Sequence, residues 1–306
     1  MPILIVLAAA ALIGFAITLY CYRITFYSPD KTQENIYNIP TDPQYQPQRA
    51  VMVQMIRETA AIPCEMVSMT SRSGMRLCGR YYHVDDNAPL AICFHGYRST
   101  SIRDVCGGAI LAMEQGHNVL LVDQRAHGKS SGHTITFGIR ERLDCVDWIH
   151  WGMERLRADV PIFLYGISMG ASTVLMAAGD DLPANVRGII ADCPYSSPYD
   201  IIRKVCKDQK YPPALTMPFI QAAARLFGNF SLTECTAAEA VKRTNIPILM
   251  IHGEDDRGVP CAMSAEIQGP SVRRHTFPDA GHGISYMKDT PRYHRLVKEF
   301  LKEIMA

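Results

Sequence analysis

The sequence has no excess of charge of either sign: its 306 residues include 31 Lys and Arg against 30 Asp and Glu, which gives a formal net charge of +1. The basic residues are scattered and form no stripe, so the chain has no electrostatic footprint for binding a nucleic acid. Internal repeats and low-complexity tracts are also missing. With 20% charged and 48% hydrophobic residues, the composition is that of a globular chain long enough to bury a sizeable core.

The ten cysteines do not include a C-x-x-C pair, so a structural zinc site is not expected. Their spacing is irregular, and an oxidised framework is typical of smaller chains. Several of them, such as Cys93, Cys145 and Cys193, lie in apolar runs, where cysteine usually acts as a small hydrophobe. We therefore expect reduced thiols.

An uncharged apolar run extends from Ile3 to Tyr22 and ends at Arg23. Its length matches a helix that crosses a hydrocarbon layer about 30 Å thick. Aromatic residues gather at its C-terminal edge, as interfacial aromatics do: Tyr20, Tyr22, Phe26 and Tyr27. The alternative is a secretory signal, but no charged residue precedes the run and no small-x-small cleavage site follows it.

We therefore interpret residues 1–23 as a single transmembrane anchor or an uncleaved signal, which predicts a cell-membrane protein. Arg23, Lys31 and Arg49 follow the run, and this bias favours a cytoplasmic location for the catalytic body. Residues 24–47 are rich in Pro, Asn, Gln, Thr and Asp and are interpreted as a linker.

The body, residues 48–306, alternates short apolar runs with longer helical patterns. Strands are expected at 65–70, 76–83, 90–94, 118–123, 162–166, 188–192, 248–251 and 272–277, and helices at 101–115, 138–156, 169–179 and 291–304. The first two strands have no helix between them, which predicts an antiparallel hairpin. The rest form β-α-β units, which predict an α/β fold: a mostly parallel sheet with helices on both faces.

The segment of about 194–245 breaks this alternation, since it holds four internal prolines and two helix-like pieces. We interpret it as a small helical cap inserted over the strand ends. Ligands of such sheets bind beyond the carboxyl ends of the strands, so chemistry is expected under this cap.

A G-x-S-x-G string, Gly166-Ile167-Ser168-Met169-Gly170, lies between a predicted strand and a predicted helix. The string alone is a common turn, but in this context it places the serine on a sharp, strained and exposed bend. Ser168 is therefore the candidate nucleophile. A serine hydroxyl needs a base, and the base needs an orienting acid.

Candidates for both are expected after later strands, in the order Ser, acid, His. Asp256 lies in the loop after strand 248–251, with Asp255 beside it, and His282 lies in a Gly-flanked loop before the last helix. Asp192, at the end of the preceding strand, is the alternative acid.

An oxyanion hole requires two backbone N–H groups. The residue after the nucleophile, Met169, supplies one, and Tyr97, in the loop His95-Gly96-Tyr97 after strand 90–94, is expected to supply the other. His95 is expected to brace this loop.

These motifs together resemble the α/β-hydrolase superfamily, and within it serine hydrolases similar to esterase-like and prolyl-oligopeptidase-like members. The residues that carry the resemblance, from about Glu65 to the C-terminus, are His95-Gly96-Tyr97, Gly166 to Gly170, His252 to Pro260, Gly281-His282-Gly283 and the Asp123 to Ser130 loop. In the family this last loop is mainly structural, so Asp123 and His127 are not assigned catalytic roles. The Asp255-Asp256 pair departs from the commonest pattern of the family.

The sequence predicts hydrolysis of carboxylic esters of small or lipid-derived substrates through an acyl-enzyme, with neither metal nor cofactor. Ser168 is the predicted nucleophile, His282 the base, and Asp256 the acid that orients the imidazole. Alternatives are a serine peptidase or aminoacyl hydrolase, a thioesterase or acyltransferase, and a receptor module that retains the triad. Peptidases of the oligopeptidase kind usually carry a large N-terminal propeller, for which residues 1–64 are too short. The expected partners are a small ester or amide substrate and the membrane; the oligomeric state is left open.

Overall fold

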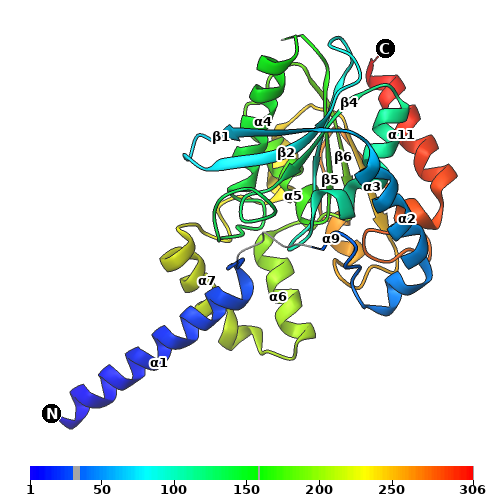
Figure 1. The fold of residues 1–306 in the computed structure, drawn as a ribbon. Coiled ribbons are helices and arrows are strands. Elements are labelled where there is room, and N and C mark those ends of the chain that lie inside the picture. The colour runs from blue at the N-terminus through cyan, green and yellow to red at the C-terminus, as the bar shows by residue number, and fades with distance from the viewer. Residues whose placement is uncertain (30–34, 158, 306) are drawn as a thin grey trace.

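The computed structural model describes residues 1–29, 35–157 and 159–305 and is built around one eight-stranded sheet (Figure 1). The strands are β1 (Glu65–Thr70), β2 (Arg76–Tyr82), β3 (Leu90–Phe94), β4 (Asn118–Asp123), β5 (Ile162–Ile167), β6 (Val186–Asp192), β7 (Ile248–Gly253) and β8 (Val272–Phe277). Their order in the sheet is β1-β2-β4-β3-β5-β6-β7-β8. The β1–β2 and β2–β4 pairs are antiparallel and the others are parallel, which confirms the predicted hairpin and the mostly parallel sheet.

Helices cover both faces of this sheet. The helices of the described residues, of which α1, α6 and α7 lie beyond the sheet edge, are α1 (Pro2–Thr25), α2 (Arg49–Ala61), α3 (Ser101–Glu114), α4 (Glu141–Arg155), α5 (Met169–Ala177), α6 (Pro198–Asp208), α7 (Pro213–Gly228), α8 (Ala237–Ala240), α9 (Cys261–Ala265), α10 (Ser285–Lys288) and α11 (Thr290–Met305). The expected helices of the body are confirmed to within a few residues, because their apolar positions recur with the helical period.

Side chains on the central strands alternate between two cores, as the two-residue period of a strand requires. In β3, Ile92 and Phe94 pack with α4 and α5, whereas Ala91 and Cys93 pack with α2, α3 and α11. Every residue of β3 is buried. A strand buried on both faces reads as a continuous apolar run, which is why it was recognisable in the sequence.

A third core lies at the carboxyl-terminal edge of the sheet. It joins buried side chains of α6 and α7 to Phe26, directly after α1, and to the loops around Phe137 and Tyr195. Figure 1 shows α6 and α7 below the sheet, with α1 extending away from the body beside α7.

The predicted linker, residues 24–47, connects α1 to the body, and several of its described residues pack against that body. Phe26 and Ile39 are buried, Tyr27 forms a β-bridge with Thr134, and residues 43–48 form a short 3-10 helix. Residues 30–34 of the predicted linker, which include Lys31, lie outside the described residues. Apolar side chains spaced singly among polar ones give no periodic signal, so the sequence did not show this packing.

Helix α1 is the candidate membrane span. By length and composition it can cross a membrane, a test that a signal sequence near the N-terminus also passes. Most of its side chains are exposed, and burial begins only toward its C-terminal end, at Thr18 and Cys21. The ten cysteines, all within the described residues, are free.

Candidate active site

Ser168 lies on the sharp turn between β5 and α5 and has positive backbone dihedral φ, 56°. A non-glycine residue rarely adopts this conformation, and such strain is concentrated at functional sites. The two flanking glycines are required by close packing: a Cβ at Gly170 would lie 2.1 Å from the backbone oxygen of Phe94. A Cβ at Gly166 would lie 2.4 Å from the backbone of Gly170. The turn therefore exposes the hydroxyl at the sheet edge.

The structure brings three of the predicted residues together at this edge. The imidazole Nε2 of His282 lies 2.9 Å from Ser168 Oγ, and its Nδ1 lies 2.7 Å from Asp256 Oδ2. His282 is in the loop between β8 and α10, and Asp256 is in the loop between β7 and α9. Because a carboxylate only accepts, Nδ1 carries the proton, which leaves Nε2 of the neutral ring to accept the Ser168 hydroxyl proton.

The charge of Asp256 is stabilised by its surroundings. Its burial opposes ionisation, but the neighbouring His282 and His252 rings outweigh this and lower the pKa of Asp256 to about 2. The backbone N–H of Val259 donates to its Oδ1 at 2.8 Å, and His252 Nε2 lies 3.2 Å from its Oδ2.

The pairing with Asp256 also changes the pKa of His282. Burial opposes protonation of the imidazole, but the Asp256 carboxylate prevails and raises the pKa of His282 above its ordinary 6.5. The Asp256 carboxylate thus stabilises the imidazolium that forms when His282 takes a proton in catalysis.

The alternative acid, Asp192, occupies a different environment. It is buried at the end of β6, and burial raises its pKa to about 6. Within the described part of the chain, its Oδ1 has no hydrogen-bond partner and it forms no hydrogen bond with His282. Asp256, and not Asp192, is therefore the carboxylate that hydrogen-bonds to the imidazole of His282. Asp255 is exposed, whereas Asp256 is buried.

The two predicted oxyanion donors are the backbone N–H groups of Met169 and Tyr97. That of Met169 is the first of α5, where N–H groups have no intrahelical partner. That of Tyr97, in the loop after β3, has no hydrogen-bond partner within the described ranges. Both are thus available to an oxyanion.

Two buried histidines hold the loop that carries Tyr97. His95 donates through Nδ1 to a carbonyl oxygen of the same loop, and its Nε2 accepts from the backbone N–H of Gln124 at 3.2 Å. His127 Nε2 accepts from the backbone N–H of Arg98 at 3.0 Å, and its Nδ1 donates to the carbonyl of Arg125. Both rings need one donor and one acceptor nitrogen, so both are neutral. Burial also lowers the pKa of His95.

Asp123 likewise has structural partners, as the resemblance implied. Its carboxylate accepts from Ser101 Oγ at 3.0 Å and from the backbone N–H of Lys129 at 3.1 Å. It ties the end of β4 to the start of α3.

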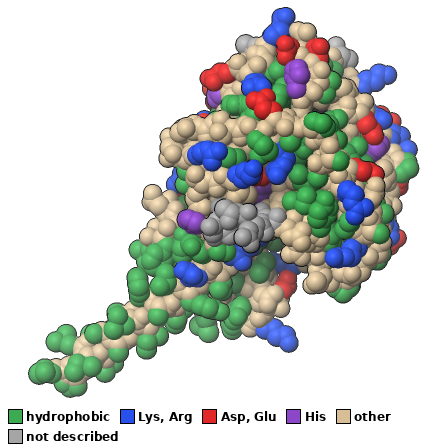
Figure 2. All heavy atoms as spheres, viewed as in Figure 1, with side chains coloured by type: hydrophobic (Ala, Val, Ile, Leu, Met, Phe, Trp, Pro, Cys, Tyr) green, Lys and Arg blue, Asp and Glu red, His purple; other side chains and the backbone are tan. Residues whose placement is uncertain are grey.

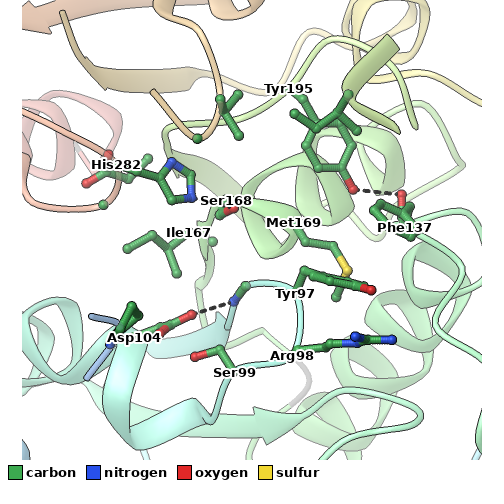
Figure 3. A pocket seen from close by; sticks show the side chains of 18 of the residues that line it. Tyr97, Arg98, Ser99, Asp104, Phe137, Ile167, Ser168, Met169, Tyr195 and His282 are labelled. Atoms are coloured by element: carbon green, nitrogen blue, oxygen red, sulfur yellow. Dashed lines mark hydrogen bonds between the residues drawn. The ribbon is translucent and has the colours of Figure 1, made fainter. Parts of the chain in front are cut away.

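Sequence reasoning missed Asp104, which faces the site from the first turn of α3 (Figure 3). Its Oδ2 accepts from the backbone N–H of Gly96 at 2.8 Å. This bond holds the loop from His95 to Arg98, named the oxyanion loop after its predicted role, next to Tyr97. An acidic residue in the first turn of a helix is common for reasons of helix stability alone, so the sequence offered no distinguishing signal.

Gln44 was also missed. Its Oε1 accepts from the backbone N–H of His282 at 2.7 Å, so the segment that follows α1 holds the histidine loop. The two residues are 238 positions apart, and nothing in the sequence links them.

The candidate triad opens into a cavity of about 950 Å³. Figure 3 shows the His282 ring pointing toward Ser168, with Met169 and Tyr97 beyond it. The walls are mostly apolar and come from α1, the oxyanion loop, α3, α6 and α7. From α1 the lining residues are Ile17, Tyr20, Cys21, Ile24 and Thr25.

One group of potential metal ligands lies here: donor atoms of Cys193, Asp256 and His282 are within 4.8 Å of one another. The carboxylate and imidazole already hydrogen-bond to each other, and burial keeps the pKa of the Cys193 thiol well above its ordinary value. A protonated thiol is not a metal ligand, so the group fits a hydrogen-bonded triad better than a metal site.

With this geometry established, the chain can be compared with known protein families, sequences and structures. Residues 92–232 match the family model described as alpha/beta hydrolase fold. The uncharacterized protein YqkD of Bacillus subtilis is 26% identical over 305 residues, which cover 97% of this chain and 96% of YqkD. The lysophosphatidylserine lipase ABHD12 of Macaca fascicularis is 23% identical over 61% of this chain, which spans only 48% of that relative. The esterase Pf2001 of Pyrococcus furiosus has a similar structure, with a TM-score of 0.69 and 21% identity over 92% of this chain and 99% of that one.

The strand order, the matched model and the similar structures agree on one class. Residues 92–232 match the alpha/beta-hydrolase family model, and the chain has the α/β-hydrolase fold predicted from its motifs.

Proposed function

We propose that this protein is a membrane-anchored serine hydrolase that cleaves carboxylic esters through an acyl-enzyme. The observation that carries the proposal is the continuous chain of hydrogen bonds from Ser168 Oγ through His282 to Asp256, at 2.9 and 2.7 Å. It occurs on a strained strand-to-helix turn with two available N–H groups beside it.

In the first half-reaction, Ser168 Oγ attacks the carbonyl carbon while His282 Nε2 takes the hydroxyl proton. The carbonyl oxygen becomes an oxyanion that accepts hydrogen bonds from the N–H groups of Tyr97 and Met169. Loss of one such donor typically raises the barrier by about 3–4 kcal/mol. The imidazolium then gives its proton to the leaving alkoxide, the ester C–O bond breaks, and an acyl-serine remains.

The second half-reaction repeats these roles with water. His282 removes a proton from water as its oxygen attacks the acyl carbon, and it returns that proton to Ser168 as the acid departs. Asp256 stays ionised and keeps the proton of His282 on Nδ1 throughout.

The lining of the cavity supports an apolar acyl group as the part that is bound. The segment 194–245, which contains α6 and α7, is proposed to act as a cap over that group, and α1 as the anchor. The lipid ester named for the ABHD12 relative is consistent with such a substrate, although this chain spans about half of that protein.

The test is steady-state turnover of p-nitrophenyl butyrate by the full chain in detergent. Ser168→Ala should lower kcat by about 10⁶-fold, since removal of the nucleophile disables the whole triad, and should abolish labelling by a fluorophosphonate. Ser73→Ala, in the exposed β1–β2 turn, is the matched control and should behave as wild type. Undiminished turnover by Ser168→Ala would refute the proposal. Labelling without turnover would favour a receptor that retains the triad.

A further inference from the structure

Helix α7 carries an apolar stripe that the protein itself does not cover. Leu215 and Leu226 are 69% and 68% exposed, and Ala214 and Pro218 are also exposed. The one ionisable residue of α7 is Arg225, in the last turn. Exposed apolar residues gathered on one helix usually mark an interaction site.

What covers this stripe follows from the position of α7 relative to α1. The ring of Phe227 lies 5.8 Å from that of Phe15 and 5.4 Å from that of Tyr22. Helix α7 is therefore packed along the candidate membrane span, and Figure 2 shows apolar side chains covering α1 and the neighbouring surface of the body.

The length of α1 fixes how deep this contact lies. Its 24 residues extend about 36 Å at 1.5 Å per residue, about 6 Å more than the hydrocarbon layer. Even if all of this excess emerges at the C-terminal end, the hydrocarbon boundary falls near Cys21. Phe15 then lies about 9 Å inside the layer. The ring of Phe227, which lies next to both Phe15 and Tyr22, is therefore between that depth and the hydrocarbon boundary.

The junction between α1 and the body is held by hydrogen bonds. Carbonyl oxygens at the end of α1 accept from the oxyanion loop: that of Thr25 from the Tyr97 hydroxyl at 2.8 Å, and that of Ile24 from Arg98 Nη2 at 2.9 Å. These bonds satisfy carbonyls that a helix end leaves unpaired. The active site is thus held at a fixed height next to the membrane.

The cavity reaches the same region. Its outer wall includes Ile17 and Tyr20, which are 39% and 57% exposed, together with Val205 of α6 and Tyr211 after it. Ile17 lies four residues before Cys21 on α1, or about 6 Å inside the hydrocarbon boundary placed above. The wall of the cavity therefore continues into the lipid layer.

We propose that α7 is an interfacial helix embedded in one leaflet beside α1, and that the cavity opens into that leaflet between α1 and the α6–α7 pair. The substrate is then an amphiphilic ester of the bilayer, whose long acyl chain enters laterally and whose carbonyl reaches Ser168. The statement about substrate rests on the proposed function, whereas the embedding of α7 does not.

The embedding is tested without any turnover. The full chain carrying Leu226→Trp is placed in vesicles of phosphatidylcholine with brominated acyl chains, which quench tryptophan only at short range. The added fluorescence should be strongly quenched. Val84→Trp is the matched control, because Val84 is 49% exposed in the loop after β2, on the body, and should escape quenching. Equal fluorescence of Leu226→Trp in brominated and plain vesicles would overturn the proposal.

The lateral entry is tested with two substrates in the same vesicles. The double variant Leu215→Asp, Leu226→Asp should lower kcat/KM at least tenfold for a long-chain fluorescent ester held in the bilayer. It should leave kcat/KM for soluble p-nitrophenyl acetate unchanged, since neither leucine lines the cavity. Val84→Asp should change neither value. Unchanged cleavage of the bilayer ester by the double variant would refute lateral entry.

Three remaining outcomes are decisive as well. If the double variant loses both activities, the quenching of Leu226→Trp decides whether α7 is embedded, because this variant introduces no charge. If Leu226→Asp converts a dimer to a monomer in detergent, and Leu226→Trp is not quenched, the stripe is an interface between two copies and the proposal is wrong. Retained turnover by Ser168→Ala would refute the proposed function and leave the quenching result standing.

Discussion

Replacement of Asp256 by Asn removes one charge from the centre of the candidate triad with almost no change in shape. In the wild-type protein, His282 Nδ1 donates to Asp256 Oδ2 at 2.7 Å, which fixes the tautomer and raises the pKa of the ring. The Asn side chain can present its NH₂ to Nδ1, which would move the ring proton to Nε2. That nitrogen could then no longer accept the proton of Ser168.

The size of the effect follows from the geometry. With the charges about 4 Å apart and an effective dielectric constant of about 20, the carboxylate stabilises the imidazolium by about 4 kcal/mol. This attraction is opposed by burial of the ring, so its loss leaves burial opposed only by the smaller effects of Asp104 and Asp192, and the pKa of His282 falls. Because the ring proton is also on the wrong nitrogen, kcat should fall by about 10⁴-fold, which corresponds to a barrier higher by about 5 kcal/mol.

The assay is kcat/KM for p-nitrophenyl butyrate as a function of pH. Activity requires neutral His282, so the wild-type rate is lost as the pH falls through the raised pKa of that residue. In Asp256→Asn the residual rate should persist to lower pH. Asp192→Asn is the matched control and should keep most of its activity, because Asp192 forms no hydrogen bond with the ring among the described residues. If Asp192→Asn loses the rate and Asp256→Asn retains it, the assignment of the acid is wrong.

Three further changes test other parts of the site and fold. Gly170→Ala places a Cβ 2.1 Å from a backbone oxygen, so the variant should lose turnover and unfold at lower temperature; a wild-type Tm would contradict this. Gln44→Ala frees the backbone N–H of His282 and should lower kcat more than it changes KM, with a wild-type Tm; an unchanged kcat would exclude a positioning role. In the wild-type protein the buried guanidinium of Arg125 pairs with both carboxylate oxygens of Asp144 at 2.6 Å. Asp144→Ala removes this partner and should lower the free energy of unfolding by about 3–5 kcal/mol. An unchanged free energy of unfolding in calorimetry would refute this.

Much of the fold was predictable because its signals are local. The strands of the sheet are buried on one or both faces, so their apolar runs stand out, and the helices between them repeat with their own period. The turn at Ser168 was recognisable because only glycine fits at Gly166 and Gly170. Helix α1 was visible for a similar reason, since its sequence is a continuous apolar run.

The contacts of the segment that follows α1 could not be predicted. Its described residues read as polar, proline-rich connection, yet Ile39 is buried and Gln44 holds the histidine loop. The role of Asp104 was hidden in the same way, because a single carboxylate in a first helical turn has an ordinary local explanation. A contact between residues far apart in sequence leaves no periodic trace in either partner.

The sequence by itself determined the order of strands and helices along the chain, the strained serine turn and the apolar N-terminal helix. It also determined the types of residue that can take part in acyl transfer. The tertiary structure showed that His282 hydrogen-bonds to Asp256, which the sequence favoured, and not to the alternative Asp192, and it packed α7 along α1 at the mouth of the cavity. The reason is physical. Local periodicity and steric limits act within a few residues, whereas proton transfer and burial depend on ångström distances between segments that only the folded chain brings together.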